Sequence, residues 1–404
     1  MALRIVATRP NPALVTLPWD TLLEEWGDDV IVQLPRGLSR HVVRIVRIGS
    51  DVYAVKETRD RYAFREYRLL RDLRRLGLPA VEPVGVVTGR VGKDGSEIEP
   101  CLITRHLRFS LPYRSLFSHG LPAENLSSLV DALVVLLVRL HLAGFYWGDV
   151  SLSNVLFRRS AGAFTAYLVD AETGELHQEL SPGQREHDLD VAITNIFGEL
   201  LDLQAGVLLD ASVDALAIAE LVRSRYETLW GELTGADEFT TNEIWRIEQR
   251  IERLNDLGFD VDELDIVTDW DGATVRMQPK VVEAGHHSRE LQGLTGLNVE
   301  DNQARRLLND LAAYTAHAEL GAEDRAVVAH RWLTRIYEPI TALIPAHLRG
   351  RLEPAEVFHE ILEHRWYLSE RAGEEVDLFE AAKSYVEHVL TARPEEALAS
   401  DPSL

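Results

Sequence analysis

Three polar side chains between residues 140 and 174 have types and spacings that suit phosphate chemistry. Asp149 is followed five residues later by Asn154, and Asp170 lies 21 residues after Asp149, where the apolar run 166–169 ends. Carboxylate oxygens suit Mg2+, which prefers one or two carboxylates together with substrate phosphates. The pattern therefore predicts a proton acceptor and a magnesium site around a nucleoside triphosphate.

A triphosphate also needs a cation, and the first hundred residues offer one on regular structure. Lys56 ends an extended run at 52–56, and Glu66 lies ten residues later in an amphipathic helix predicted over 64–77. Five extended runs are expected, at 30–34, 41–48, 52–56, 78–87 and 101–104, with a hairpin turn at 93–96. These runs predict an antiparallel meander, preceded by a short helix at 17–27.

The pattern then becomes mostly helical. A buried helix is expected at 126–142, two short strands at 154–157 and 166–169 around a turn at 160–162, and helices at 188–203 and 210–232. Beyond residue 240 we expect a helix at 245–258 capped by Thr241, and a β-hairpin at 264–279 turning at Asp271-Gly272. Four helices near 300–319, 323–344, 354–370 and 376–391 complete the prediction.

Length and composition narrow the class of protein. A chain of 404 residues predicts two or three domains. The single Cys101 allows neither an intrachain disulfide nor a cysteine-based metal site. The beginning of the chain lacks the apolar core of a signal peptide, and the helix at 126–142 is too short and too charged to span a bilayer. A cytoplasmic protein without a membrane span is expected.

The charge is unevenly distributed along the chain. Residues 1–120 contain 19 basic and 14 acidic side chains, whereas the remainder contains 23 basic and 51 acidic ones. Neutralising a phosphate backbone requires clustered cations, so general nucleic-acid binding is not expected of the acidic part. Most arginines of the first portion are interpreted as solvated surface groups, although some could face an anionic ligand.

The order of these groups resembles the protein-kinase-like fold over about residues 28–230. The short form Gly148-Asp149-x-x-x-x-Asn154 is similar to the lipopolysaccharide-kinase-like and RIO-like branches of that fold. The whole chain resembles an actinobacterial family in which such a domain precedes a C-terminal domain of unknown function. The resemblance implies an α+β chain: a five-stranded antiparallel N-lobe at 1–108, a helical C-lobe at 109–235, and a mostly α-helical C-terminal domain with a β-hairpin at 236–404.

The resemblance also implies an ATP- and Mg2+-dependent phosphotransferase. Phosphoryl transfer is catalysed mainly by positioning and by charge neutralisation. Lys56, paired with Glu66, is expected to contact the α- and β-phosphates, and Asp149 is expected to take the proton of the acceptor hydroxyl. Asn154 and Asp170 are the expected magnesium ligands. The expected nucleotide-binding residues are Ala54, Gly37, Leu156 and the hinge segment Thr104, Arg105, His106 and Leu107.

Several departures from protein kinases keep alternatives open. The loop at 34–40 has only Gly37, Trp147 replaces the usual histidine, and Asp170-Ala171-Glu172 lacks the usual phenylalanine. Asp188 follows Asp170 too closely for an ordinary peptide-docking segment. The expected acceptor is a small molecule, a lipid or sugar, or an unusual protein hydroxyl. A catalytically weak or inactive nucleotide-binding scaffold and a nucleotidyl (AMP) transferase are the alternatives.

The C-terminal region carries fewer chemical signals. His286 and His287 are expected on an extended segment with rings pointing opposite ways, which favours surface or packing histidines over a metal pair. His359 and His364 are five residues apart, which does not match two ligands on one helix face. Regulation, substrate capture, homodimerisation and binding of a protein partner all remain open for this domain.

Overall fold

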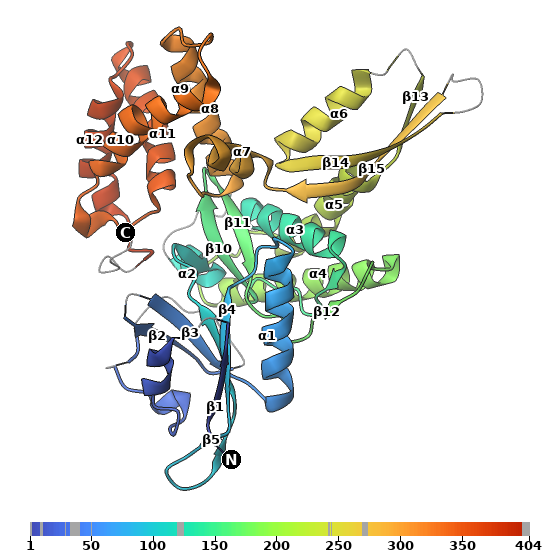
Figure 1. The fold of residues 1–404 in the computed structure, drawn as a ribbon, viewed down its shortest axis with the longest axis vertical. Coiled ribbons are helices and arrows are strands. Elements are labelled where there is room, and N and C mark those ends of the chain that lie inside the picture. The colour runs from blue at the N-terminus through green and yellow to red at the C-terminus, as the bar shows by residue number, and fades with distance from the viewer. Residues whose placement is uncertain are drawn as a thin grey trace. The chain divides into compact units, whose positions relative to one another are not determined.

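The computed structural model describes residues 2–8, 11–28, 30–32, 41–49, 51–118, 125–240, 243, 245–268 and 274–397. The predicted phosphate loop with Gly37, the cap Thr241 and the turn Asp271-Gly272 lie outside these residues. The chain forms two compact units, shown in Figure 1. The first unit contains Met1–Arg158, Thr165–Ser224 and Glu396–Leu404, and the second contains Arg159–Phe164 and Arg225–Glu395.

The first unit begins with a five-stranded antiparallel sheet, which confirms the predicted N-lobe architecture. The spatial order is β1 (Arg4–Ala7), β4 (Pro83–Thr88), β7 (Cys101–Arg105), β3 (Asp51–Glu57) and β2 (Val43–Ile48). The prediction of a strand at 30–34 was wrong for its described part, residues 30–32, where Ile31 forms only an isolated bridge to Val46. The fifth strand is β1, which pairs with the buried strand β4 and completes that side of the sheet.

The predicted helix at 17–27 was also wrong. This segment contains only a short 3-10 turn, η2 (Leu23–Glu25), which follows a similar turn, η1 (Pro12–Thr16). Pro18 would remove a backbone donor inside a helix. Instead, Trp19 and Trp26 pack edge to face, and their indole N–H groups donate to the carbonyls of Leu14 and Thr21. The apolar side chains are therefore buried by an irregular segment rather than by one face of a helix.

Helix α1 (Asp60–Arg75) packs against β4, and its buried side includes Ala63, Leu70 and Leu73. In Figure 1 it lies alongside the sheet. A two-stranded hairpin, β5 (Arg90–Val91) and β6 (Glu97–Ile98), encloses the predicted turn at 93–96. The helix thus follows the strand that carries Lys56 and presents Glu66 on its buried side.

The rest of the first unit is mainly helical. Its helices are α2 (Tyr113–Ser118), α3 (Leu126–Leu142), α4 (Pro182–Ala205) and α5 (Ala215–Thr234); the last residues of α5 belong to the second unit. Short strands are β8 (Ser110–Pro112), β9 (Phe145–Tyr146), β10 (Val155–Ser160), β11 (Ala163–Leu168) and β12 (Glu175–Leu176). The apolar pattern of 126–142 predicted α3 to the residue, because most of its residues are buried.

The second unit combines a three-stranded sheet with helices. Strands β14 (Phe259–Thr268) and β15 (Thr274–Ala284) form the predicted hairpin, extended by β13 (Asp237–Thr240), and α6 (Trp245–Asp256) packs against β14. The helices that follow are α7 (His286–Thr295), α8 (Asp301–His317), α9 (Arg325–Trp332), α10 (Glu338–Ala342), α11 (Pro354–Ala372) and α12 (Leu378–His388). Trp332, Tyr337 and Phe358 contact one another in the core of this helical part.

Two predictions in this unit need correction. The segment 323–344 is not one regular helix, because a π-helical turn at Leu333–Tyr337 separates α9 from α10. Pro339 lies just beyond this turn, and a proline inside a helix removes one hydrogen bond and clashes with the preceding turn. His286 and His287 begin helix α7 and are not on an extended segment. Among the described residues, no helix is long and apolar enough to cross a membrane.

Candidate active site

Lys56 joins three elements of the first unit through its ammonium group. Nζ donates to both carboxylate oxygens of Glu66, at 3.1 and 3.0 Å, and to Oδ2 of Asp170 at 2.8 Å. The Lys56 side chain is 13% exposed and the Glu66 side chain is fully buried. The structure therefore brings together three residues that the sequence placed on a strand, a helix and a segment 114 residues away.

Burial and charge pairing act in opposite directions on this cluster. Burial raises the pKa of Glu66 to about 7, against the lowering effect of Lys56. Burial lowers the pKa of Lys56, but Glu66 and Asp170 outweigh it and the net shift is upward. The pKa of Asp170 is lowered because Lys56 outweighs its burial. Lys56 is thus held as a cation, and Asp170 as an anion.

The hairpin of β10 and β11 positions the two predicted metal ligands. Asn154 directly precedes β10, and Asp170 follows the end of β11 by two residues. The N–H of Val169 donates to the carbonyl of Asn154 at 3.0 Å, which holds the two ends of the hairpin together. An antiparallel pair therefore brings Asn154 and Asp170 to the same end of the hairpin.

Asp149 is oriented by two amide side chains. Asn154 Nδ2 donates to the backbone oxygen of Asp149 at 2.9 Å and to its Oδ2 at 3.1 Å. Asn195 Nδ2 donates to Asp149 Oδ1 at 3.3 Å and to the carbonyl of Val150 at 3.0 Å. Because both contacts of Asn154 use its NH2 group, its amide oxygen remains available as a metal ligand.

The loop that carries Asp149 is held by acidic side chains of α4. Asp188, which is fully buried, accepts from the N–H groups of Trp147 at 2.8 Å and Gly148 at 2.7 Å. Glu199 accepts from the N–H groups of Leu152 and Ser153, both at 2.8 Å. Burial raises the pKa of Glu199 despite these donors. The loop conformation thus depends on α4.

Asp188, Asn195 and Glu199 were not predicted as site residues. Their spacing of seven and four residues puts them on one face of α4. Asp188 lies on the same helix as the buried residues Ala192 and Ile196. These three residues could have been predicted from the sequence, because they are polar and recur at the spacing of one helix face. Polar groups that become buried on such a face need hydrogen-bond partners.

Two cavities meet at the cluster. One, of about 770 Å3, is lined by Ala54, Lys56, Leu156, Asn154, Asp170 and the hinge residues Thr104, Arg105, His106 and Leu107. The other, of about 1000 Å3, is lined among others by Asp149, Asn154, Asp170 and Asn195. Asn154 and Asp170 line both cavities. All the predicted site residues that the structure describes line these cavities, except Glu66, which is buried behind Lys56.

The donor chemistry fits a divalent cation such as Mg2+. Glu66, Asp170 and Glu172 each place a carboxylate oxygen within 4.8 Å of the others. A carboxylate oxygen of Glu172 also lies 2.9 Å from Nε2 of His41. Glu172 follows strand β11, and His41 precedes strand β2. Carboxylate oxygens together with the amide oxygen of Asn154 form the all-oxygen set that Mg2+ prefers.

Two known protein families match separate parts of this chain. Residues 41–193 match the family model described as "Lipopolysaccharide kinase (Kdo/WaaP) family", and residues 228–390 match "Domain of unknown function (DUF4032)". The chain has a kinase-like fold. Each model covers less than half of the chain, and their order confirms the predicted arrangement of a kinase-like domain followed by a domain of unknown function.

The remaining comparisons are more distant. A solved structure described as "WaaP in complex with acyl carrier protein" matches with 18% sequence identity, covering 56% of this chain and 99% of that chain, with a TM-score of 0.32. No curated protein matches the chain.

The kinase-like domain accommodates its departures from protein kinases by specific contacts. The indole N–H of Trp147 donates to the carbonyl of Asp170 at 3.0 Å, and the hydroxyl of Thr173 donates to the carbonyl of Trp147 at 2.8 Å. Trp147 and Ala171 are both fully buried. The tryptophan thus connects the loop of Asp149 with the segment of Asp170.

Proposed function

We propose that the kinase-like domain is an ATP- and Mg2+-dependent phosphotransferase. The observation that supports this function best is the Lys56–Glu66–Asp170 cluster at the junction of two cavities. It combines a cation for phosphate oxygens with a carboxylate for a metal. Catalysis of phosphoryl transfer depends chiefly on such positioning and charge neutralisation. The similarity to the lipopolysaccharide kinase family supports the same class of reaction.

The nucleotide is assigned to the smaller cavity. Ala54 and Leu156 provide apolar walls for the base, and Lys56 faces the phosphates. The N–H groups of Arg105 and His106 already donate to the carbonyls of Glu82 and Val52. Within the described hinge segment this leaves the Leu107 N–H as the backbone donor for the base. Burial lowers the pKa of His106 to about 4, so its ring adds no charge beside the base.

Mg2+ is assigned to Asn154 and Asp170, where it would neutralise phosphate oxygens of the bound nucleotide. Lys56 would then share Asp170 with the metal, and its ammonium would contact phosphate oxygens of the bound nucleotide. Glu66 retains its contact with Lys56 and fixes the direction of that side chain. Gly37, the remaining predicted nucleotide contact, lies outside the described residues.

The acceptor is assigned to the larger cavity, where Asp149 lies between two asparagine amides. These amides hold the carboxylate in one orientation, as a general base for a hydroxyl requires. Arg59, Tyr62, Thr173 and Asp202 also line this cavity. Its polar lining fits the hydroxyl of a small molecule, a lipid or sugar headgroup, or an unusual protein site.

The proposal also includes a cytoplasmic location for the protein and domain limits at residues 108 and 235.

The decisive variant is Asp149→Asn. It keeps the side-chain shape and removes the proton acceptor, so turnover should fall by about 10²–10⁴-fold while Mg2+–ATP binding is retained. Binding is measured by calorimetry and turnover by ATP consumption, with candidate acceptors present. Asp210→Asn is the matched control, because Asp210 is an exposed turn residue of the same unit.

Three outcomes separate this proposal from the alternatives. Absence of Mg2+- or Mn2+-dependent binding of ATP or GTP would refute the nucleotide site. Binding without transfer to any acceptor or to the chain itself would indicate an inactive scaffold. Intact mass after incubation with ATP distinguishes addition of a phosphoryl group from addition of AMP, and only the phosphoryl product agrees with the proposal.

A further inference from the structure

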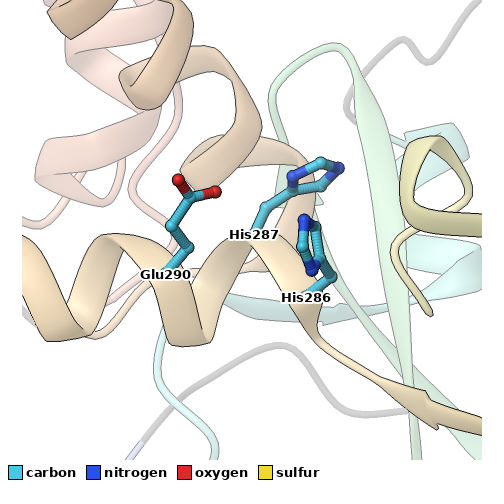
Figure 2. Close-up of side chains that lie close together, drawn as sticks. All are labelled: His286, His287 and Glu290. Carbon is cyan, nitrogen blue, oxygen red and sulfur yellow. The ribbon is translucent and has the colours of Figure 1, made fainter. Parts of the chain in front are cut away.

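Three metal-ligating side chains meet at the start of helix α7 in the second unit. His286, His287 and Glu290 each place one potential ligand atom within 4.8 Å of the others. Figure 2 shows the two imidazole rings side by side and the carboxylate of Glu290 one turn further along the helix. Because this segment is helical, the adjacent histidines do not point to opposite faces as on a strand, and a common ligand is geometrically possible.

His286 has the arrangement that proteins use for a metal-bound imidazole. Its Nδ1 contacts a carboxylate oxygen of Asp260, on strand β14, and the other carboxylate oxygen contacts Arg289. A histidine that ligates a metal commonly donates its second ring N–H to a carboxylate, which fixes the tautomer and the ring orientation. With Nδ1 directed at Asp260, Nε2 of His286 is the nitrogen left for a metal.

His287 supplies a second nitrogen. Its Nε2 atom is buried and makes no hydrogen bond to any described residue. Its ring lies 5.0 Å from the ring of His286, centroid to centroid, in an edge-to-face arrangement. A role in packing alone leaves this buried nitrogen without a partner, whereas a metal ion would satisfy it.

Glu290 completes the set with a carboxylate. It lies three residues after His287 and four after His286, spacings that share a helix face. One of its oxygens, Oε1, contacts Arg325 of α9. The second oxygen can act as a metal ligand while this ion pair is kept, because a carboxylate accepts at both oxygens.

We propose that His286, His287 and Glu290 bind a divalent transition-metal ion of the zinc class, with Asp260 as the group that orients His286. Two imidazole nitrogens and one carboxylate oxygen are a ligand set for Zn2+ and not for Mg2+. Tetrahedral ligand atoms lie roughly 3.4 Å apart when metal distances are near 2.1 Å, so the side chains need only close around the ion.

The site would connect separate elements of the second unit. Asp260 belongs to β14, the ligands belong to α7, and Arg325 begins α9. The inference does not depend on the proposed phosphotransferase activity, since none of these residues belongs to the first unit.

The experiment uses the full chain after removal of metals. Calorimetry with Zn2+ should show one strong site per chain, and Co2+ should give the intense visible absorption of a tetrahedral complex, which Zn2+ then displaces. His286→Gln/His287→Gln should abolish both signals. Asp260→Asn should weaken Zn2+ binding by about 10–100-fold, as expected for a residue that orients a ligand.

Three controls keep the test decisive. His317→Gln changes an exposed histidine of the same unit and should leave binding unchanged. Asp170→Asn should also leave it unchanged, which excludes the carboxylates of the kinase-like cleft as the zinc site. Circular dichroism confirms folding, and Glu290→Gln provides a milder ligand variant. Absence of strong Zn2+ binding, or binding unaffected by the double histidine change, would overturn the proposal.

Discussion

Two clusters of this protein each bring three potential metal ligands within 4.8 Å of one another, yet their chemistry differs. In the kinase-like domain, Glu66, Asp170 and Glu172 offer only oxygen atoms. In the second unit, His286 and His287 contribute nitrogens beside Glu290. Hard oxygen donors favour Mg2+, whereas imidazole donors favour zinc and its neighbours. Donor type, and not proximity, therefore separates the two sites.

The neighbouring charges differ as well. Lys56 lies within the carboxylate cluster and already neutralises part of it. A magnesium ion at the proposed site would compete with this ammonium, and nucleotide phosphates would reduce that competition, so the proposal ties the metal to the nucleotide. In the histidine cluster, Asp260 contacts His286, and Arg325 contacts Glu290. We therefore expect the proposed zinc site to bind its ion without a nucleotide.

The largest effect is expected from Asp170→Asn. Removing this proposed charged ligand should weaken Mg2+–ATP binding by at least about 10²-fold, since a metal contributes several kcal/mol of charge stabilisation. Calorimetry with Mg2+–ATP measures the change. Asp94→Asn, an exposed residue of the β5–β6 hairpin, is the control. Unchanged affinity in Asp170→Asn would remove this residue from the metal site.

The pH dependence of stability should identify Glu66 as the buried carboxyl of the cleft. Its pKa is raised from 4.5 to about 7, mainly by burial, so the folded protein retains a proton that the unfolded chain loses. The associated stability is fully present below pH 4.5 and is lost as the pH rises to about 7. The loss is on the order of 3 kcal/mol.

Urea unfolding of the wild type and of Glu66→Gln across this range measures the effect. Glu66→Gln cannot ionise, so its free energy of unfolding should lack this decrease. Glu97→Gln, an exposed site in the same lobe, should behave like the wild type. Parallel pH profiles for the wild type and Glu66→Gln would contradict the assignment.

Removal of zinc should affect only the second unit. Zn2+ at about 100 times its dissociation constant stabilises the folded state by roughly 2.7 kcal/mol, and a chelator should reverse this. Thermal unfolding with and without Zn2+ measures the shift, and Mg2+–ATP binding should stay the same. Mg2+ at the same concentration is the control. An equal shift in the double histidine variant would contradict a site at α7.

The smallest effect is expected from Arg325→Ala. The ion pair of Arg325 with Glu290 is on the surface, where such pairs contribute about 0–1 kcal/mol. Its removal takes a positive charge away from the metal and should tighten Zn2+ binding by about two- to five-fold. Arg335→Ala, exposed in the same unit, should change nothing. Weaker binding in Arg325→Ala would show that the arginine supports the ligand geometry.

Sequence patterns predicted the regular elements in which one face, or most of the residues, is buried. Helix α3 was predicted to the residue, and the order of Lys56, Glu66, Asp149, Asn154 and Asp170 along the chain carried the resemblance to the kinase-like fold. Irregular burial was not predictable in the same way. Trp19 and Trp26 pack against each other because the segment 17–27 bends. Strand β1 has only four residues, and it forms by pairing with β4.

By itself, the sequence determined which chemical groups this protein carries and on which kinds of element they lie. Only the tertiary structure decided which of them meet. Asp188, Asn195 and Glu199 hold a loop 40 to 47 residues away in the chain, and Asp260 approaches His286 across the β14–β15 hairpin. The periodicity of apolar residues in a short segment indicates which face of a helix or strand is buried. A hydrogen bond between distant segments depends instead on the tertiary path of the chain, which no short stretch of sequence determines.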